Sequence, residues 1–141
     1  MSDADKMADA SKPALRRFDG FVPERAPIDA YGNGGFRFAG MSHRGSIFIA
    51  PDGTHAWAID EPETAPDMTG PLLALLERLQ PPQFLLVGAG RRQIFPAAIV
   101  RAAFLARQVG LDVMDTGAAC RTFNVLIAER RPVMAALAAV E

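Results

Sequence analysis

The strongest constraint on the fold is a strand, a helix and a second strand joined by short turns in the second half of the chain. The segment QFLLVG at 83–88 is a continuous apolar run of strand length, which is typical of a strand buried on both faces of a sheet. A helix opened by Pro96 follows, and LDVMD at 111–115 predicts a second buried strand. Connections of this kind are right-handed crossovers between parallel strands, so we expect these two strands to be parallel.

The segments on either side predict three further helices. A leucine stripe between residues 72 and 79 has helical spacing, and Thr69 is its predicted N-cap. Gly110 is expected to follow the helix between the two strands as its C′ residue. Another helix is predicted from about 116 to 130, and Pro132 is expected to begin a short last helix.

The first half of the chain predicts antiparallel strands. Residues 28–60 have the pattern of a meander, with turns at Gly32-Asn33-Gly34-Gly35 and at Pro51-Asp52-Gly53. The chain is therefore predicted to be α/β, with an antiparallel section at its front. We expect residues 1–24 to be a flexible tail and residues 25–141 to be a single domain.

Charge and composition argue against several classes of function. Fifteen basic and sixteen acidic residues give a net charge of −1, which argues against nucleic-acid binding. One cysteine excludes an intramolecular disulfide, and the two histidines have no zinc-site spacing. No apolar run is long enough for a transmembrane segment, and the acidic N-terminal segment lacks the features of a secretory or transit peptide. We expect a cytoplasmic protein without a metal ion or cofactor.

Candidate binding residues follow the two buried strands. Ligands of open parallel sheets bind outside the carboxyl ends of the strands. If these strands are neighbours, the loops after them form a crevice between residues 88–92 and 115–121. Helix starts and guanidinium groups at such a crevice favour a small anion. The candidates are Gly88, Gly90, Arg91, Arg92, Asp115, Thr116, Cys120, Arg121 and Asn124.

These residues also have structural explanations. Gly88 and Gly90 fit a tight turn with positive φ, and the missing third glycine argues against a dinucleotide site. Cys120 lies near the first turn of a helix and beside an arginine, where a thiol can become nucleophilic. It also lies on the apolar stripe of that helix, where a free cysteine is usually inert packing. Asp115 or Thr116 most simply caps the helix.

Three segments resemble a known family. They are GGFRFAGMSHRGSI, LLVGAG and, above all, VMDTGAACRTFNVLIAERRPVMAAL, which is similar to the small domain-of-unknown-function family that includes mitochondrial respiratory complex I assembly factor 3 and the adipogenesis-associated domain protein. The resemblance implies a three-layer domain with a central mixed sheet, in which N-terminal antiparallel strands precede β-α-β-α. It implies no established enzymatic activity and supplies no catalytic residues. Family members often carry a larger residue where this chain has Gly117, so a side chain there is not essential in this protein.

Two hypotheses for the function follow. The first is a non-enzymatic interaction protein, an assembly factor-like domain for a respiratory or other membrane complex. Its partner is then a membrane-complex subunit or assembly intermediate, which can hold the protein at the inner face of the membrane. The alternative is a small anion-binding domain or a thiol-dependent enzyme that uses the crevice at 88–92 and 115–121.

Overall fold

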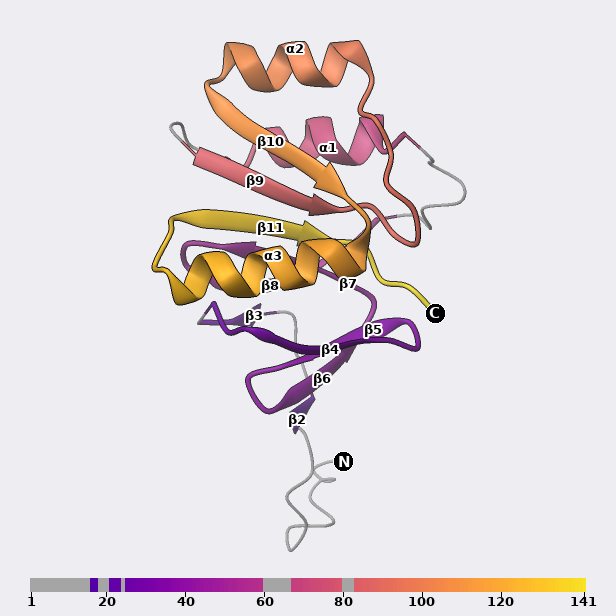
Figure 1. The fold of residues 1–141 in the computed structure, drawn as a ribbon, viewed down its shortest axis with the longest axis vertical. Coiled ribbons are helices and arrows are strands. Elements are labelled where there is room, and N and C mark those ends of the chain that lie inside the picture. Colours follow the sequence, from indigo (N-terminus) through magenta and orange to yellow (C-terminus); the bar gives the residue numbers. More distant parts are fainter. Residues whose placement is uncertain (1–15, 18–20, 24, 60–66, 80–82) are drawn as a thin grey trace, which may run out of the picture.

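A six-stranded mixed sheet forms the centre of the molecule (Figure 1). The computed structural model describes residues 16–17, 21–23, 25–59, 67–79 and 83–141. In spatial order the strands are β10 (Val109–Met114), β9 (Gln83–Gly88), β11 (Val133–Leu137), β7 (Ser46–Ala50), β8 (Gly53–Trp57) and β3 (Phe21–Val22). β9 is parallel to both β10 and β11, whereas β11, β7, β8 and β3 pair in antiparallel fashion. The predicted α/β fold with a central mixed sheet is confirmed.

Three helices pack on the two faces of this sheet (Figure 1). They are α1 (Thr69–Leu76), α2 (Ala98–Ala106) and α3 (Thr116–Ala128). Leu85 and Val87 of β9 pack with residues of α1 and α2, whereas Leu86 packs with residues of α3. All three side chains are fully buried because helices cover both faces of β9. This arrangement explains the continuous apolar run of this strand.

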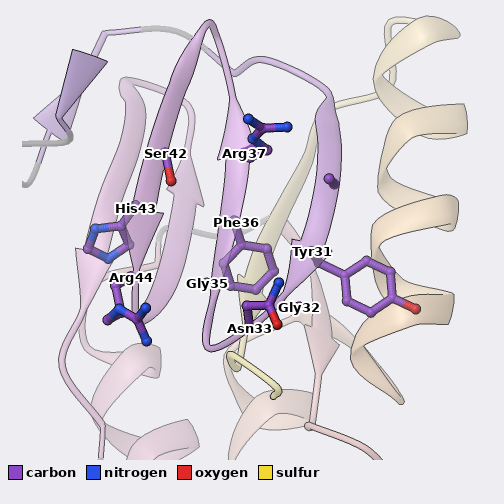
Figure 2. A pocket seen from close by; sticks show the side chains of 10 residues that line it. Tyr31, Gly32, Asn33, Gly35, Phe36, Arg37, Ser42, His43 and Arg44 are labelled. Carbon is purple, nitrogen blue, oxygen red and sulfur yellow. The ribbon is translucent and has the colours of Figure 1, made fainter. Parts of the chain in front are cut away.

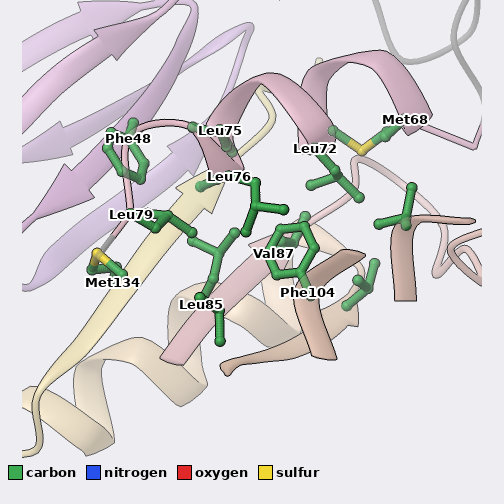
Figure 3. Packing of buried hydrophobic residues seen from close by; sticks show 14 of the residues in the cluster. Phe48, Met68, Leu72, Leu75, Leu76, Leu79, Leu85, Val87, Phe104 and Met134 are labelled. Carbon is green, nitrogen blue, oxygen red and sulfur yellow. The ribbon is translucent and has the colours of Figure 1, made fainter. Parts of the chain in front are cut away.

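The leucine stripe of α1 faces the central sheet, as predicted (Figure 3). Leu72, Leu75 and Leu76 are buried in one cluster with Val87 of β9 and Phe104 of α2. Apolar burial of this kind, at about 25 cal/mol per Å², is the main stabilising contribution to such a core.

A second, four-stranded sheet packs on the face that α3 covers. Its strands, in spatial order, are β2 (Arg16–Arg17), β6 (Met41–Arg44), β5 (Gly35–Phe38) and β4 (Ile28–Gly32). Phe36 and Phe38 of β5 join the cluster that contains Phe123 of α3. The sequence predicts one meander over 28–60, but the chain changes sheets at Gly45, where φ is 109°. The hairpin β7–β8 therefore belongs to the central sheet.

Two predicted helix ends are wrong. Met68, with φ of 53°, is the N-cap of α1, and Thr69 is the first helical residue. The Asp67 carboxylate accepts the Thr69 N–H, so this neighbouring side chain satisfies the free backbone donor. The positive-φ residue after α2 is Gln108, at 59°, rather than Gly110. Gly110 instead lies within β10, opposite the ring of Phe84.

The predicted last helix is also wrong, because the residues after Pro132 form β11. This strand is inserted between β9 and β7, and all five of its residues are buried. Its segment, VMAAL, has good helix formers, but pairing on both edges and burial on both faces outweigh that local preference.

Strand pairing begins before residue 25. Within the segment expected to be a tail, Arg16–Arg17 pairs with β6 and Phe21–Val22 pairs with β8. Val22 is buried in the same cluster as α3. Residues 1–15, 18–20 and 24 of that expected tail lie outside the described residues.

Candidate functional site

The carboxyl ends of β9 and β10 lie side by side, as the crevice hypothesis requires. Gly88 is directly opposite Met114 in the parallel register. Beyond the strands, Ala89 N–H donates to Met114 O at 2.8 Å, and Thr116 N–H donates to Gly90 O at 2.8 Å. We call residues 88–92 and 115–121 together the strand-end seam. The first turn of α3 thus lies against the loop that follows β9.

Thr116 links three segments at the centre of this seam. Its hydroxyl accepts the Gly90 N–H at 2.9 Å and donates to Ala138 O at 2.7 Å. Ala138 N–H in turn donates to Gly88 O at 2.8 Å. The Thr116 side chain is fully buried, so these bonds satisfy polar groups that water does not reach. This threonine therefore joins the β9 loop, the start of α3 and the residue after β11.

Two glycines of the seam have different roles. Gly90 has φ of 106°, in the region that favours glycine. Gly88 has no positive φ, but a Cβ there would lie 2.9 Å from Thr116 Cα and 3.1 Å from Ala119 Cβ. The prediction of a positive-φ turn thus applies to Gly90 alone. Gly88 is needed because α3 packs closely on the end of β9.

The seam does not activate Cys120. Its side chain is only 3% exposed and packs in the cluster with α3. Burial is the largest effect on its pKa and raises it to about 12, against a smaller lowering by Arg121 and a further increase from Asp115. The thiol therefore stays protonated at neutral pH. A thiolate nucleophile is not available in this conformation.

Asp115 forms a local hydrogen bond and Asn124 forms long-range ones, and both shape the fold. Of the two residues predicted as the cap of α3, Asp115 is the N-cap, and its carboxylate accepts the Ala118 N–H at 2.8 Å. The Asn124 amide accepts from Ile28 N–H at 2.8 Å and donates to Ile28 O at 2.9 Å. These two bonds hold β4 against α3, next to the register shift between Ile28 and Ala30. Asn124 thus connects segments that are 96 residues apart.

The arginines of the seam lie at its surface. Arg91, Arg92 and Arg121 are all exposed, whereas Thr116 and Cys120 are buried. The structure therefore places the candidate residues in the same region but at different burial. Thr116 and Cys120 are packed inside, whereas the guanidinium groups lie at the surface. Anion binding at this seam stays a prediction.

A second surface, which the sequence analysis did not identify, lies over α2 and the adjoining strand β10. Phe95, Ile99 and Leu105 are 83%, 63% and 80% exposed. A groove of about 420 Å³ runs between the segment 93–96, α2 and β10. Among the described strands, β10 lies at the edge of the central sheet, so its outer backbone groups are paired with no other described strand. We call this region the α2–β10 surface.

A sequence signal for this surface does exist. Val100 and Phe104 form the buried stripe of α2, while Ile99 and Leu105 lie off that stripe and are still large and apolar. A helix with apolar residues on both sides needs more cover than one sheet provides. The stripe that faces the sheet includes neither residue, so that stripe alone does not predict the surface.

Among the described residues, no group of three or more His, Cys, Asp or Glu side chains is placed to hold a metal ion. In the same part of the chain, no helix is both long enough and apolar enough to cross a membrane.

Similarity to known proteins covers most of the chain. Residues 28–138 match the family described as protein of unknown function (DUF498/DUF598). An uncharacterized protein of Rhodobacter capsulatus is 35% identical over 79% of this chain and 82% of its own length. The human NADH dehydrogenase (ubiquinone) 1 alpha subcomplex assembly factor 3 is 32% identical over 78% of this chain. The matched region spans only 59% of that human protein.

Solved structures share the fold. One from Bartonella henselae, described as an outer membrane protein, is 46% identical and has a TM-score of 0.69 over 84% of this chain and 98% of its own. The protein Rpa2829 of Rhodopseudomonas palustris is 41% identical and has a TM-score of 0.72 over 90% of this chain and 93% of its own.

Proposed function

Because the chain belongs to the DUF498/DUF598 family, in which the human relative is a complex I assembly factor, we propose that it is an interaction protein that assists the assembly of a membrane complex. The sequence similarity supports an assembly factor-like role. A respiratory complex is the target that the relative's name suggests. In this proposal the protein acts without catalysis, in the cytoplasm or at the inner face of the membrane through its partner.

The observation that carries this proposal is the exposed apolar surface over α2 and β10. Phe95 and Leu105, which both line the groove, are each at least 80% exposed. Scattered exposed apolar residues are normal, but large ones gathered around a groove mark interaction sites. Removing such side chains from water favours association by about 25 cal/mol per Å² of apolar area, before the costs of binding are subtracted.

The occupant that fits best is an extended, apolar segment of a protein subunit. An edge strand offers a row of backbone donors and acceptors to which such a segment can add as another strand. β10 has that free edge, and the groove runs beside it. The Gln93 amide donates to Val113 O at 3.3 Å, so a side chain of the groove already occupies one acceptor of β10. A partner strand replaces this single side-chain bond by a ladder of backbone bonds.

Site-specific photocrosslinking in cells tests this proposal. A photoreactive residue in place of Leu105 is expected to crosslink to a subunit or assembly intermediate of a membrane complex. The matched control replaces Val125, which is 56% exposed on α3 and distant in sequence from the groove. A label at Val125 is expected to give no such product.

A double variant supplies the complementary measurement. Phe95→Ser with Leu105→Ser removes apolar area that is already exposed, so we expect the free energy of unfolding to change by less than about 0.5 kcal/mol. Co-purification of the membrane-complex partner should be lost, while Val125→Ser retains it. Full retention of that partner by the double variant would disprove a role for the α2–β10 surface.

A further inference from the structure

The outer side of the four-stranded sheet contains a hollow that shares no lining residue with the two surfaces described above. It has a volume of about 420 Å³ and lies over β4, β5 and β6 (Figure 2). The residues that matter for its chemistry are Gly32, Arg37, Ser42 and Arg44. We call it the arginine hollow. No residue of the strand-end seam or of the α2–β10 surface lines it.

Small residues create this hollow. Ala30, Gly32, Gly35 and Ser42 all line it, so several adjoining sheet positions carry little or no side chain. A Cβ on Gly32 would meet nothing within 4 Å, which shows that the space beside this strand end is open. The side chains of a sheet stand roughly perpendicular to it and usually cover its surface. Between Arg37 and Arg44 the side chains are too small to do so, which leaves a hollow.

The strand register places the polar side chains on one face. Arg37 of β5 is opposite Ser42 of β6, and Arg44 is two residues further along β6. Because side chains alternate along a strand, Ser42 and Arg44 share a face, and the buried Phe36 and Phe38 belong to the other. Arg37 and Arg44 are thus diagonal neighbours, with Cβ atoms about 7–8 Å apart in an ordinary sheet. Figure 2 shows both guanidinium groups with Ser42 on the same strand pair.

The positive charge of the hollow is not balanced from within. No Asp or Glu is among its lining residues. In the part of the chain that the structure describes, Arg37 has no carboxylate within ion-pair distance. Glu141 stands at one rim, since a Cβ on Gly34 would lie 3.3 Å from Arg44 Nη1 and 3.5 Å from Glu141 Oε2. That acid reduces the charge near Arg44 but leaves Arg37 uncompensated.

We propose that the arginine hollow binds the phosphate group of a small molecule. A phosphate group carries a charge of about −1.5 to −2 and several strong acceptor oxygens, so it can take bonds from two guanidinium forks and one hydroxyl. Arg37 and Arg44 supply the forks, and Ser42 supplies the hydroxyl. The volume exceeds what a phosphate group alone fills, so the rest of the ligand lies over the open backbone of Gly32. This site is independent of the proposed function.

Titration of the full chain with inorganic phosphate tests this site. Backbone amide shifts are followed by NMR while sodium chloride keeps the ionic strength constant, because salt screens exposed charges. We expect saturable shifts centred on β5 and β6. Arg37→Gln and Arg44→Gln should each weaken binding by about tenfold or more. Ala30→Leu, which keeps the charge but fills the hollow, should also weaken it.

Matched variants make the result decisive. Arg92→Gln and Arg121→Gln remove exposed arginines of the strand-end seam, and we expect them to bind phosphate like the parent chain. Unchanged spectra away from the altered residue show that each variant is folded. Shifts that stay linear with phosphate, or that weaken only in the seam variants, would overturn the proposal. Equal affinity for acetate at the same ionic strength would also overturn it, because the site would then not distinguish phosphate from a carboxylate.

Discussion

Gly88 at the strand-end seam and Gly32 at the arginine hollow have opposite surroundings. A Cβ on Gly88 would lie 2.9 Å from Thr116 Cα, whereas a Cβ on Gly32 would meet nothing within 4 Å. The hydroxyl side chains of the two regions differ in the same way. Thr116 of the seam is fully buried and hydrogen-bonded, whereas Ser42 of the hollow is exposed. At these two positions, glycine next to polar residues therefore marks close packing in one case and open space in the other, whereas Gly35 of the hollow packs closely on the backbone of His43.

The comparison shows why a motif alone does not identify a binding site. Both regions contain glycine, a hydroxyl side chain and arginine, which are the ingredients of an anion site. At the seam, a helix packs directly on the strand end and takes up the space. At the hollow, none of the helices that the structure describes covers the outer side of β4, β5 and β6 (Figure 1). The space beside Gly88 and Gly32 therefore differs between the two regions, although their residue types are alike.

The largest expected effect concerns the core beneath the seam. Phe123 is fully buried on α3, so Phe123→Ala leaves a cavity and is expected to cost about 3–5 kcal/mol in the free energy of unfolding. Val125→Ala on the same helix, at a position that is 56% exposed, should cost less than about 1 kcal/mol. Chemical denaturation measures both. A loss below about 1 kcal/mol for Phe123→Ala would show that the seam is not tightly packed.

The hydroxyl groups of the two regions provide the next test. Thr116→Val keeps the side-chain shape but leaves the Gly90 N–H and the Ala138 C=O without their buried partner, which should cost about 1–3 kcal/mol. Ser42→Ala in the hollow removes an exposed hydroxyl and should change stability by less than about 0.5 kcal/mol. Urea denaturation of the pair tests the difference. Equal losses would contradict the distinction between a closed seam and an open hollow.

The thiol of the seam should be unreactive in the folded protein. Because burial raises the pKa of Cys120 to about 12, alkylation at neutral pH should be slow and should become fast only when denaturant unfolds the chain. The unfolded thiol ionises near its ordinary value of 9.0, so between pH 9.0 and about 12 the folded state binds more protons than the unfolded state. Stability from this group is therefore lost as pH rises through that window. Rapid alkylation of the folded chain at pH 7 would instead favour a thiol-dependent enzyme.

The sequence was sufficient to predict elements with strong local patterns. The apolar run of β9, its parallel partner β10 and the Asp115 cap of α3 all have signals within a few residues. The glycine cluster between β4 and β5 likewise predicts its turn, where Gly32 and Gly34 have positive φ. In each of these segments the local preference and the tertiary structure agree.

Other features depend on partners far along the chain. β11 has the composition of a helix, and only its insertion between β9 and β7 makes it a strand. Asn124 has no local partner and instead binds the backbone of Ile28, 96 residues away. The arginine hollow requires the register of three strands together with the small residues beside Arg37 and Arg44. No short window of sequence contains that information.

The smallest expected effect is a pH dependence within the four-stranded sheet. Burial lowers the pKa of His43 below its ordinary value of 6.5, against an opposing backbone hydrogen bond at Ser46. As pH falls below 6.5, the unfolded histidine takes up a proton before the folded one does, so stability falls with acidification in that window. His43→Gln should flatten this slope in thermal unfolding measured between pH 7 and pH 5.

The lowered pKa of Asp52, which results chiefly from its hydrogen bond with His55, affects stability in a different window. Its contribution is lost only as pH falls below the ordinary value of 3.8, so it does not contribute to the slope between pH 7 and pH 5. Because Asp52 is paired with His55, the matched control is Ser42→Ala, which removes a neighbour of His43 on β6 that does not titrate and should leave that slope unchanged. If His43→Gln also leaves the slope unchanged, the His43 ring is hydrated in the folded protein. The buried face of the four-stranded sheet would then not extend to this residue.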